Sequence, residues 1–272
     1  MKLNKSKCES LCVRGRDEIR FADGTLVKKC DESKYLGCMI NDKGDPTREI
    51  NKRLSDTYLT WKKLSEFWKH SDCDVRMKLC IYDAVIRTKL VYGLESVQVN
   101  DSLKTKIDAF QLKGLRQILK MQTTYVNRLN TNKEVFRRAD EAVNSYQARQ
   151  TNVEGIFRKK QSIIPISEYY EQQRRKLFIE IVTRNLDDPI RGACCDENLQ
   201  LIEHGKKRVG RPRNNWWEHT LINFWDYLRK EHNVEYRYTA LDRRNPIHIN
   251  ALKQLAQRLQ QLEGGPMAPN AS

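Results

Sequence analysis

The sequence predicts a mainly α-helical protein with a small N-terminal portion of short strands. From position 45 onward, apolar side chains recur at steps of three and four residues, the period of an amphipathic helix. Positions 1–42 instead hold short apolar runs separated by Gly, Asp and Asn, the pattern of strands and turns. With 272 residues, the chain is long enough to form one large or two ordinary domains with a substantial core.

The N-terminal portion contains four candidate strands, "CESLCV", "EIRF", "TLVKK" and "KYLGCMI". The "FADG" stretch between two of them looks like polymerase active sites that carry an aromatic residue, an Ala and paired aspartates. Two-metal phosphoryl transfer needs at least two clustered carboxylates, whereas Gly24 follows Asp23. Asp-Gly between Phe21 and Leu26 predicts a type I′ hairpin, because both central turn residues need a positive φ. We therefore expect Asp23 to be a turn residue and not a metal ligand.

Three amphipathic helices are expected next, and they should pack as a bundle because each has one apolar stripe to bury. Asp45 is a good cap for the first, with Pro46 at the first helical position. The second opens near Asp72 or Asp74 and ends near Gly93, and the third follows "NDS". We expect their aromatic side chains to lie in the core. The stripe of the first helix is Ile50, Leu54, Tyr58, Trp61, Leu64 and Trp68.

Four further helices are predicted, in "TNKEVFRRADEAV", "PISEYYEQQRRKLFIEIVTRNL", "WWEHTLINFWDYLRKE" and "NPIHINALKQLAQRLQQLE". The tail "GGPMAPNAS" is expected to be disordered. Changes in composition and in the period of the apolar residues predict five segments, at residues 1–44, 45–125, 126–203, 204–263 and 264–272.

The excess of 50 Lys and Arg over 35 Asp and Glu gives a net charge of +15, which favours polyanionic partners, nucleic acid first and an anionic membrane surface second. Acids such as Asp56, Glu66 and Asp83 lie among the aromatic stripes and would be repelled by an anionic surface, so we expect no membrane partner. No apolar run approaches the roughly 20 residues that span a bilayer. The N-terminus also lacks the apolar core of a signal peptide, so the sequence predicts an intracellular protein.

Eight cysteines show no spacing typical of a disulfide framework, and a reducing compartment would keep them as thiols. Cys8 and Cys12 lack the second pair of ligands that a zinc site requires, so no metal is expected.

Residues 204–217, "HGKKRVGRPRNNWW", combine five cations and two indoles without a carboxylate. Such a segment joins phosphate attraction to a base-stacking or cation–π surface, so we expect it to contact nucleic acid. "GRPR" also looks like the core of an AT-hook, which lies in the minor groove, although Val209 stands where a hook usually has a basic residue. One of the two tryptophans is expected to begin a helix and pack inward. The nucleic-acid contacts predicted here are Lys206, Lys207, Arg208, Arg211, Arg213, Trp216 and Trp217.

The order of several motifs resembles the downstream part of a non-LTR (LINE-type) retrotransposon reverse transcriptase. "LNKSK" matches the "LNxxK" motif that closes the palm in that family, and "YLG" matches its primer grip. "EINKRL", "KLCIYDAVIRTKLVYGLE" and "FQLKGLRQIL" are similar to its helical thumb, and "RRKLFIEIVTRNLDDP" and "GRPRNNW" to the region after it. In the family the paired aspartates precede "LNxxK", so the resemblance implies that the catalytic box would lie before Met1 and that "FADG" is not that box.

The resemblance implies roles for particular residues. Lys7 matches a lysine near the nucleotide pyrophosphate, where a cation or proton donor stabilises the leaving group. Tyr35, Leu36 and Gly37 match the primer grip, in which a tight turn lets backbone approach the primer end. The alternatives are an ordinary surface lysine and a plain turn after a strand. Thumb cations that would contact template and primer phosphates, or form a solvated charged face, are Arg48, Lys52, Arg53, Lys62 and Lys63.

We therefore expect a truncated RNA-directed DNA polymerase fragment, made of a palm remnant, a thumb-like bundle and further helices, that binds nucleic acid without catalysing its synthesis. Its implied partners are template RNA, primer or target DNA and the upstream polymerase portion, and its implied compartment is the nucleus. No cofactor is expected in this chain, and Mg²⁺ belongs to the complete parent enzyme. The alternative is a stand-alone basic helical DNA- or RNA-binding protein. A palm remnant should leave apolar strand surface uncovered, whereas an independent domain should bury it.

Overall fold

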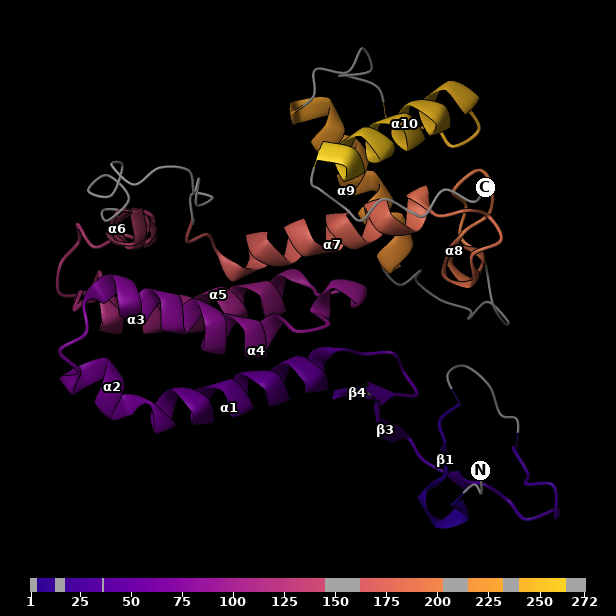
Figure 1. Cartoon of the computed structure of the whole chain (residues 1–272), viewed down its shortest axis with the longest axis horizontal. Coiled ribbons are helices and arrows are strands. Elements are labelled where there is room, and N and C mark those ends of the chain that lie inside the picture. Colours follow the sequence, from indigo (N-terminus) through magenta and orange to yellow (C-terminus); the bar gives the residue numbers. More distant parts are fainter. Residues whose placement is uncertain are drawn as a thin grey trace, which may run out of the picture. The chain divides into compact units, whose positions relative to one another are not determined.

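The computed structural model describes residues 4–12, 18–35, 37–144, 162–202, 215–231 and 240–262 (Figure 1). It is mainly helical with a small N-terminal strand portion, as predicted. The chain divides into two compact units, one made of residues 1–94 and 99–170 and the other of residues 95–98 and 171–272. No helix in the described ranges is long and apolar enough to cross a membrane.

The N-terminal strands form two small sheets. β1 (Glu9–Ser10) pairs in parallel with β2 (Lys28–Lys29), and β3 (Glu32–Tyr35) pairs antiparallel with β4 (Cys38–Asn41). Tyr35 lies opposite Cys38, so the predicted strand "KYLGCMI" is instead two strands joined at residues 36 and 37. Gly37 has a φ of 91°, which glycine adopts at little cost and other residues do not.

Asp23 lies in a hairpin turn, as predicted, but the turn is not type I′. Arg20 pairs with Leu26 across it, and the Gly24 amide donates to the Phe21 carbonyl at 2.9 Å. Only Gly24 of the two central candidates has a positive φ, at 82°. The Asp23 carboxylate accepts hydrogen bonds from the backbone amide and hydroxyl of Thr25, at 3.2 and 2.7 Å. This local Asx geometry holds Asp23 at a negative φ and leaves the left-handed position to the glycine.

The first unit then continues as helices. The helix predicted as one from position 45 is broken at Leu64, and a π-helical stretch interrupts the second. Asp74, and not Asp72, caps the second helix by accepting from the Met77 amide at 2.7 Å. The elements are α1 (Thr47–Lys63), α2 (Ser65–His70), α3 (Val75–Ile81), η2 (Tyr82–Arg87), α4 (Thr88–Val91), α5 (Asp101–Ile118) and α6 (Asn132–Asn144).

Trp61, Trp68 and Tyr82 are buried in a common core, as expected for a bundle. Tyr58 of the predicted stripe is instead 40% exposed, so the expectation that the aromatic side chains lie in the core is wrong for this residue. The rings of Trp61 and Trp68 stack with centroids 4.5 Å apart, and Tyr82 meets Trp61 edge-on at 6.0 Å. Gly114 of α5 lies against Trp61 and Tyr82, which allows the helices to approach closely. A second cluster is formed by Ile50, Leu90, Leu94, Val99, Leu103, Ile107, Ile166 and Tyr170.

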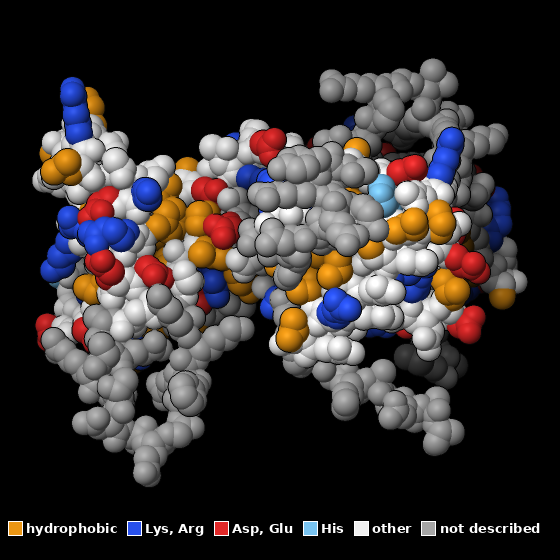
Figure 2. Space-filling model, turned by 90° about the horizontal axis from the view of Figure 1, so that it is seen from above, with side chains coloured by type: hydrophobic (Ala, Val, Ile, Leu, Met, Phe, Trp, Pro, Cys, Tyr) orange, Lys and Arg blue, Asp and Glu red, His pale blue; other side chains and the backbone are white. Residues whose placement is uncertain are grey.

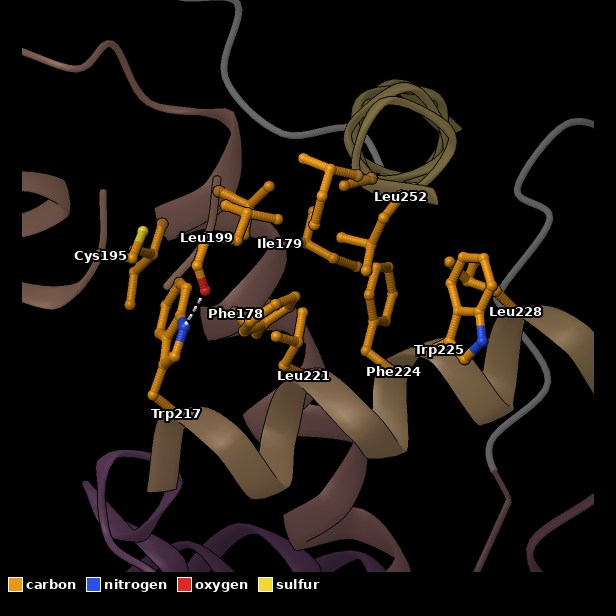
Figure 3. Close-up of a cluster of buried hydrophobic side chains, with 14 residues drawn as sticks. Phe178, Ile179, Cys195, Leu199, Trp217, Leu221, Phe224, Trp225, Leu228 and Leu252 are labelled. Carbon is orange, nitrogen blue, oxygen red and sulfur yellow. Dashed lines mark hydrogen bonds between the residues drawn. The ribbon is translucent and has the colours of Figure 1, made fainter. Parts of the chain in front are cut away.

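The second unit has its own core, drawn in Figure 3. Three of its helices were predicted, although the short α8 was not, because six residues are too few for a helical period to show. Phe178 of α7 contacts Trp217 and Phe224 of α9, with centroids 4.9 and 5.3 Å away. The elements are α7 (Ile166–Thr183), α8 (Pro189–Cys194), α9 (Trp216–Glu231) and α10 (Pro246–Leu262).

Candidate nucleic-acid interface

A groove of about 420 Å³, open to solvent, lies between α1 and α5 in the first unit. Residues one turn apart on each helix line it, since positions i, i+3 and i+4 share a helix face. Its floor is apolar and its edge carries a lysine. The lining residues are Leu54, Ser55, Tyr58, Lys106, Ala109 and Phe110.

Tyr58 contributes to this groove an aromatic ring with two ammonium groups beside it. Its side chain is 40% exposed. The Nζ atoms of Lys62 and Lys113 lie 5.0 and 6.0 Å from the ring centroid, within cation–π range. Both lysines and Lys106 are exposed, and none has a carboxylate within ion-pair distance in the described part of the chain. The groove therefore combines an apolar surface, an aromatic face and three cations available to an anionic ligand.

The cations predicted on the first helix divide into two groups. Lys52, Lys62 and Lys63 are exposed, and Arg48 is exposed while pairing with Glu32. Arg53 is buried, and its guanidinium donates to the Glu49 carboxylate, the Tyr92 carbonyl and the Cys38 Sγ, the last at 2.8 Å. Arg53 thus binds parts of the protein itself and has no surface to offer a phosphate.

The predicted primer-grip residues lie in the hairpin that Glu49 and Arg53 hold to α1. The Met39 amide of β4 donates to Glu49 Oε2 at 2.8 Å. Tyr35 is exposed at the end of β3, and a Cβ at Gly37 would meet no atom within 4 Å. Leu36 lies outside the described residues. The hairpin therefore presents an exposed ring and an approachable glycine backbone.

Lys7 is exposed in the short 3₁₀ turn η1 (Lys5–Lys7), and its side chain makes no hydrogen bond or ion pair within the described ranges. Its neighbour Lys5 instead pairs with Asp23. The Lys5 ammonium and the Thr25 hydrogen bonds lower the pKa of the exposed Asp23 carboxyl below its ordinary value. The structure thus gives Asp23 partners typical of a turn.

The two tryptophans of the C-terminal basic segment begin α9. Trp217 is 2% exposed, and its Nε1 donates to the Leu199 carbonyl at 2.9 Å (Figure 3). Its ring therefore belongs to the core and presents no face to a base. Trp216 is half-buried, and its Nε1 donates to the Glu95 carbonyl at 2.8 Å. The predicted contacts that lie outside the described residues are Lys206, Lys207, Arg208, Arg211 and Arg213.

Tyr58, Lys106 and Lys113 were not among the predicted contacts. A signal for the last of them exists in the sequence, because residues 109–133 hold five cations and no Asp or Glu. This acid-free stretch holds as many cations as residues 204–217, spread over 25 positions instead of 14. The α1 side of the groove has no comparable signal, since acids and cations alternate along that helix.

Positive and negative side chains are mixed on the face of the molecule shown in Figure 2, where described Lys and Arg side chains lie among Asp and Glu side chains. Among the residues that the structure describes, no group of three or more His, Cys, Asp or Glu is placed to hold a metal ion. Comparisons of the chain with protein-family models, curated proteins and solved structures find no match.

Proposed function

We propose that this chain binds nucleic acid through the α1–α5 groove, as the end-of-palm and thumb portion of a non-LTR retrotransposon reverse transcriptase. The observation that carries the proposal is the exposed Tyr58 ring with Lys62 and Lys113 beside it, at a groove lined largely by apolar side chains. In the parent reaction, RNA-templated DNA synthesis, this surface would hold the template–primer duplex.

The chemistry of the groove suits a nucleic-acid backbone. Lysine ammonium groups attract phosphates, and the counterions that the phosphates then release make binding more favourable. The apolar floor and the Tyr58 ring contact the faces of sugars or terminal bases, which charged side chains alone do not. The predicted thumb cations Lys52 and Lys63 are exposed on the same helix and would extend the phosphate-binding surface.

The N-terminal strands favour polymerase ancestry over a stand-alone binding protein. Of the described residues between 4 and 42, Ser10 alone is buried. Ile19, Leu26, Tyr35 and Ile40 are large apolar residues left exposed there. A self-sufficient domain would cover such surface, whereas the edge of a palm presents it to neighbouring strands.

The basic segment at residues 204–213 would supply a second contact, to target DNA or element RNA. Its acid-free composition supports this part of the proposal.

The proposal is tested by a salt titration of duplex binding. The Lys62→Gln, Lys113→Gln double variant should bind duplex DNA more weakly. The slope of the logarithm of its binding constant against the logarithm of salt concentration should be shallower by roughly 1.8, about 0.9 for each lost phosphate contact. The matched control is Lys230→Gln, Arg258→Gln, which removes the same charge from two exposed positions of the second unit. An unchanged slope in the groove variant, or an equal loss in the control, would refute a phosphate-binding groove.

A further inference from the structure

The loop between α5 and α6 exposes three large apolar side chains within five positions. Tyr125 is 97% exposed, Leu129 79% and Val126 64%. Single exposed apolar residues are common on protein surfaces, whereas exposed apolar residues that cluster are typical of interaction sites. No ring or cation contact engages Tyr125 within the described part of the chain.

Hydrogen bonds hold this loop in a defined shape. The buried Asn130 side chain donates to the Gln122 carbonyl at 2.9 Å and closes the loop at its base. Arg116 of α5 donates to the Asn130 carbonyl at 3.3 Å and to Asn132 Oδ1 at 2.8 Å. The Val126 amide donates to the Thr123 carbonyl at 3.1 Å. The loop is thus a compact element that holds its apolar side chains outward before any ligand arrives.

The charged residues near the loop in the sequence indicate which kind of partner it binds. The loop lies within the acid-free stretch of residues 109–133, whose Lys120, Arg128 and Lys133 are exposed. An exposed aromatic ring within a run of sequence that carries cations and no carboxylate matches a ligand that joins flat apolar faces to phosphates. Bases in a duplex already stack on one another, so a protein ring finds a free base face in a single strand.

We propose that this loop binds unpaired nucleotides, with Tyr125 as the platform on which a base stacks and Arg128 as a phosphate contact. The proposal rests on the function proposed above and extends it to single strands. Lys113, from the same acid-free stretch, lies beside Tyr58 at the α1–α5 groove, so one continuous run of sequence contributes to both surfaces. Val126 and Leu129 would pack against the sugar and the edge of the stacked base.

The test compares two DNA probes, a blunt duplex and the same duplex with a single-stranded extension, by fluorescence anisotropy. Tyr125→Ala should weaken binding of the extended probe by about 5- to 150-fold, the range for losing one base–aromatic stack. Binding of the blunt duplex and the salt slope should stay unchanged, because no charge is lost. Tyr125→Trp should retain or improve binding of the extended probe. Tyr92→Ala, at another exposed tyrosine of the same unit, is the matched control and should have no effect.

The outcomes separate this proposal from the groove. If the Lys62→Gln, Lys113→Gln variant weakens both probes while Tyr125→Ala weakens neither, the loop proposal fails and the groove stands. Equal binding of both probes by the unmodified chain also refutes the loop proposal. Should Tyr125→Ala reduce binding to vesicles rich in anionic lipid and leave the extended probe unaffected, the loop is a membrane contact instead.

Discussion

One arginine of an adjacent pair is structural, and no signal in the sequence distinguishes it from its neighbour. Arg174 in "RRKLF" is fully buried, whereas the adjacent Arg175 is half-buried against Tyr227. The Arg174 guanidinium donates to Thr220 Oγ1 at 2.6 Å and to His219 Nδ1 at 2.8 Å. Which of these two arginines is buried depends on which face of α7 packs against α9. Neither the charge nor the spacing of the residues in the sequence indicates that face.

We expect Arg174→Met to destabilise the second unit by about 1–3 kcal/mol, because the substitution removes the donor to buried polar groups at Thr220 and His219. Urea unfolding of the full chain measures the change. Arg258→Gln, at an exposed position of α10, should stay within about 0.5 kcal/mol of the unmodified chain. Similar stability of the two variants would mean that the Arg174 network contributes little.

Cys195 is predicted to be chemically inert in the folded chain. Burial raises the pKa of its thiol to about 11, so almost none is thiolate at pH 8. Iodoacetamide at that pH should label the exposed Cys73 first and Cys195 only after unfolding, as read by peptide mass spectrometry. Labelling of Cys195 as fast as Cys73 in native buffer would contradict its place in the core.

At the scale of elements, the helical period predicted the helices well but not their interruptions. The steps of three and four that indicate α1 continue past Leu64, where the backbone leaves the helix with φ −94° and ψ 16°. The π-helical stretch η2 buries Tyr82 and Ile86, and a spacing of four does not distinguish this wider coil from an α-helix. Both features depend on packing against other helices, which a local pattern does not contain.

Gly114→Ala should destabilise the first unit. The added Cβ would lie 3.3 Å from ring atoms of both Trp61 and Tyr82, and Trp61 is already stacked on Trp68. Overpacking costs about 1–3 kcal/mol. The higher helix propensity of Ala offsets at most about 1 kcal/mol of this.

Thermal unfolding followed by circular dichroism measures the effect. Gly192→Ala on α8 is the matched control, because its new Cβ would approach nothing closer than the Leu186 carbonyl at 3.8 Å. A rise in melting temperature for Gly114→Ala would show that Trp61 can move aside at low cost.

At the scale of the whole molecule, composition predicts a polyanionic partner but does not predict the groove that we propose as its binding site. The acid-free segment at residues 204–217 is visible in the sequence, whereas the groove needs α1 and α5 to pack before Tyr58 meets Lys113. Helix periodicity identifies which face of each helix is apolar, but it does not identify which two helices pack side by side. The groove therefore follows from tertiary packing.

The N-terminal strands should exchange their amide hydrogens faster than α1. Their sheets are two-stranded and short, and their apolar residues are largely exposed, so little free energy opposes local opening. Hydrogen–deuterium exchange with mass spectrometry compares residues 18–35 with Thr47–Lys63. Equal protection of the two regions would favour the stand-alone binding protein over a palm edge.

The Arg53 network also bears on how natural variants of this chain should be interpreted. One guanidinium joins Glu49 of α1, Cys38 of β4 and the backbone at Tyr92, so its loss would disturb three segments at once. Selection for folding alone would then keep an arginine at position 53, whether or not the chain binds nucleic acid. The exposed Lys62 and Lys113 join no such network, so selection for folding alone would leave them free to vary. If both lysines were retained across related sequences, their retention would indicate selection for binding. Retention of Arg53 would indicate only selection for folding.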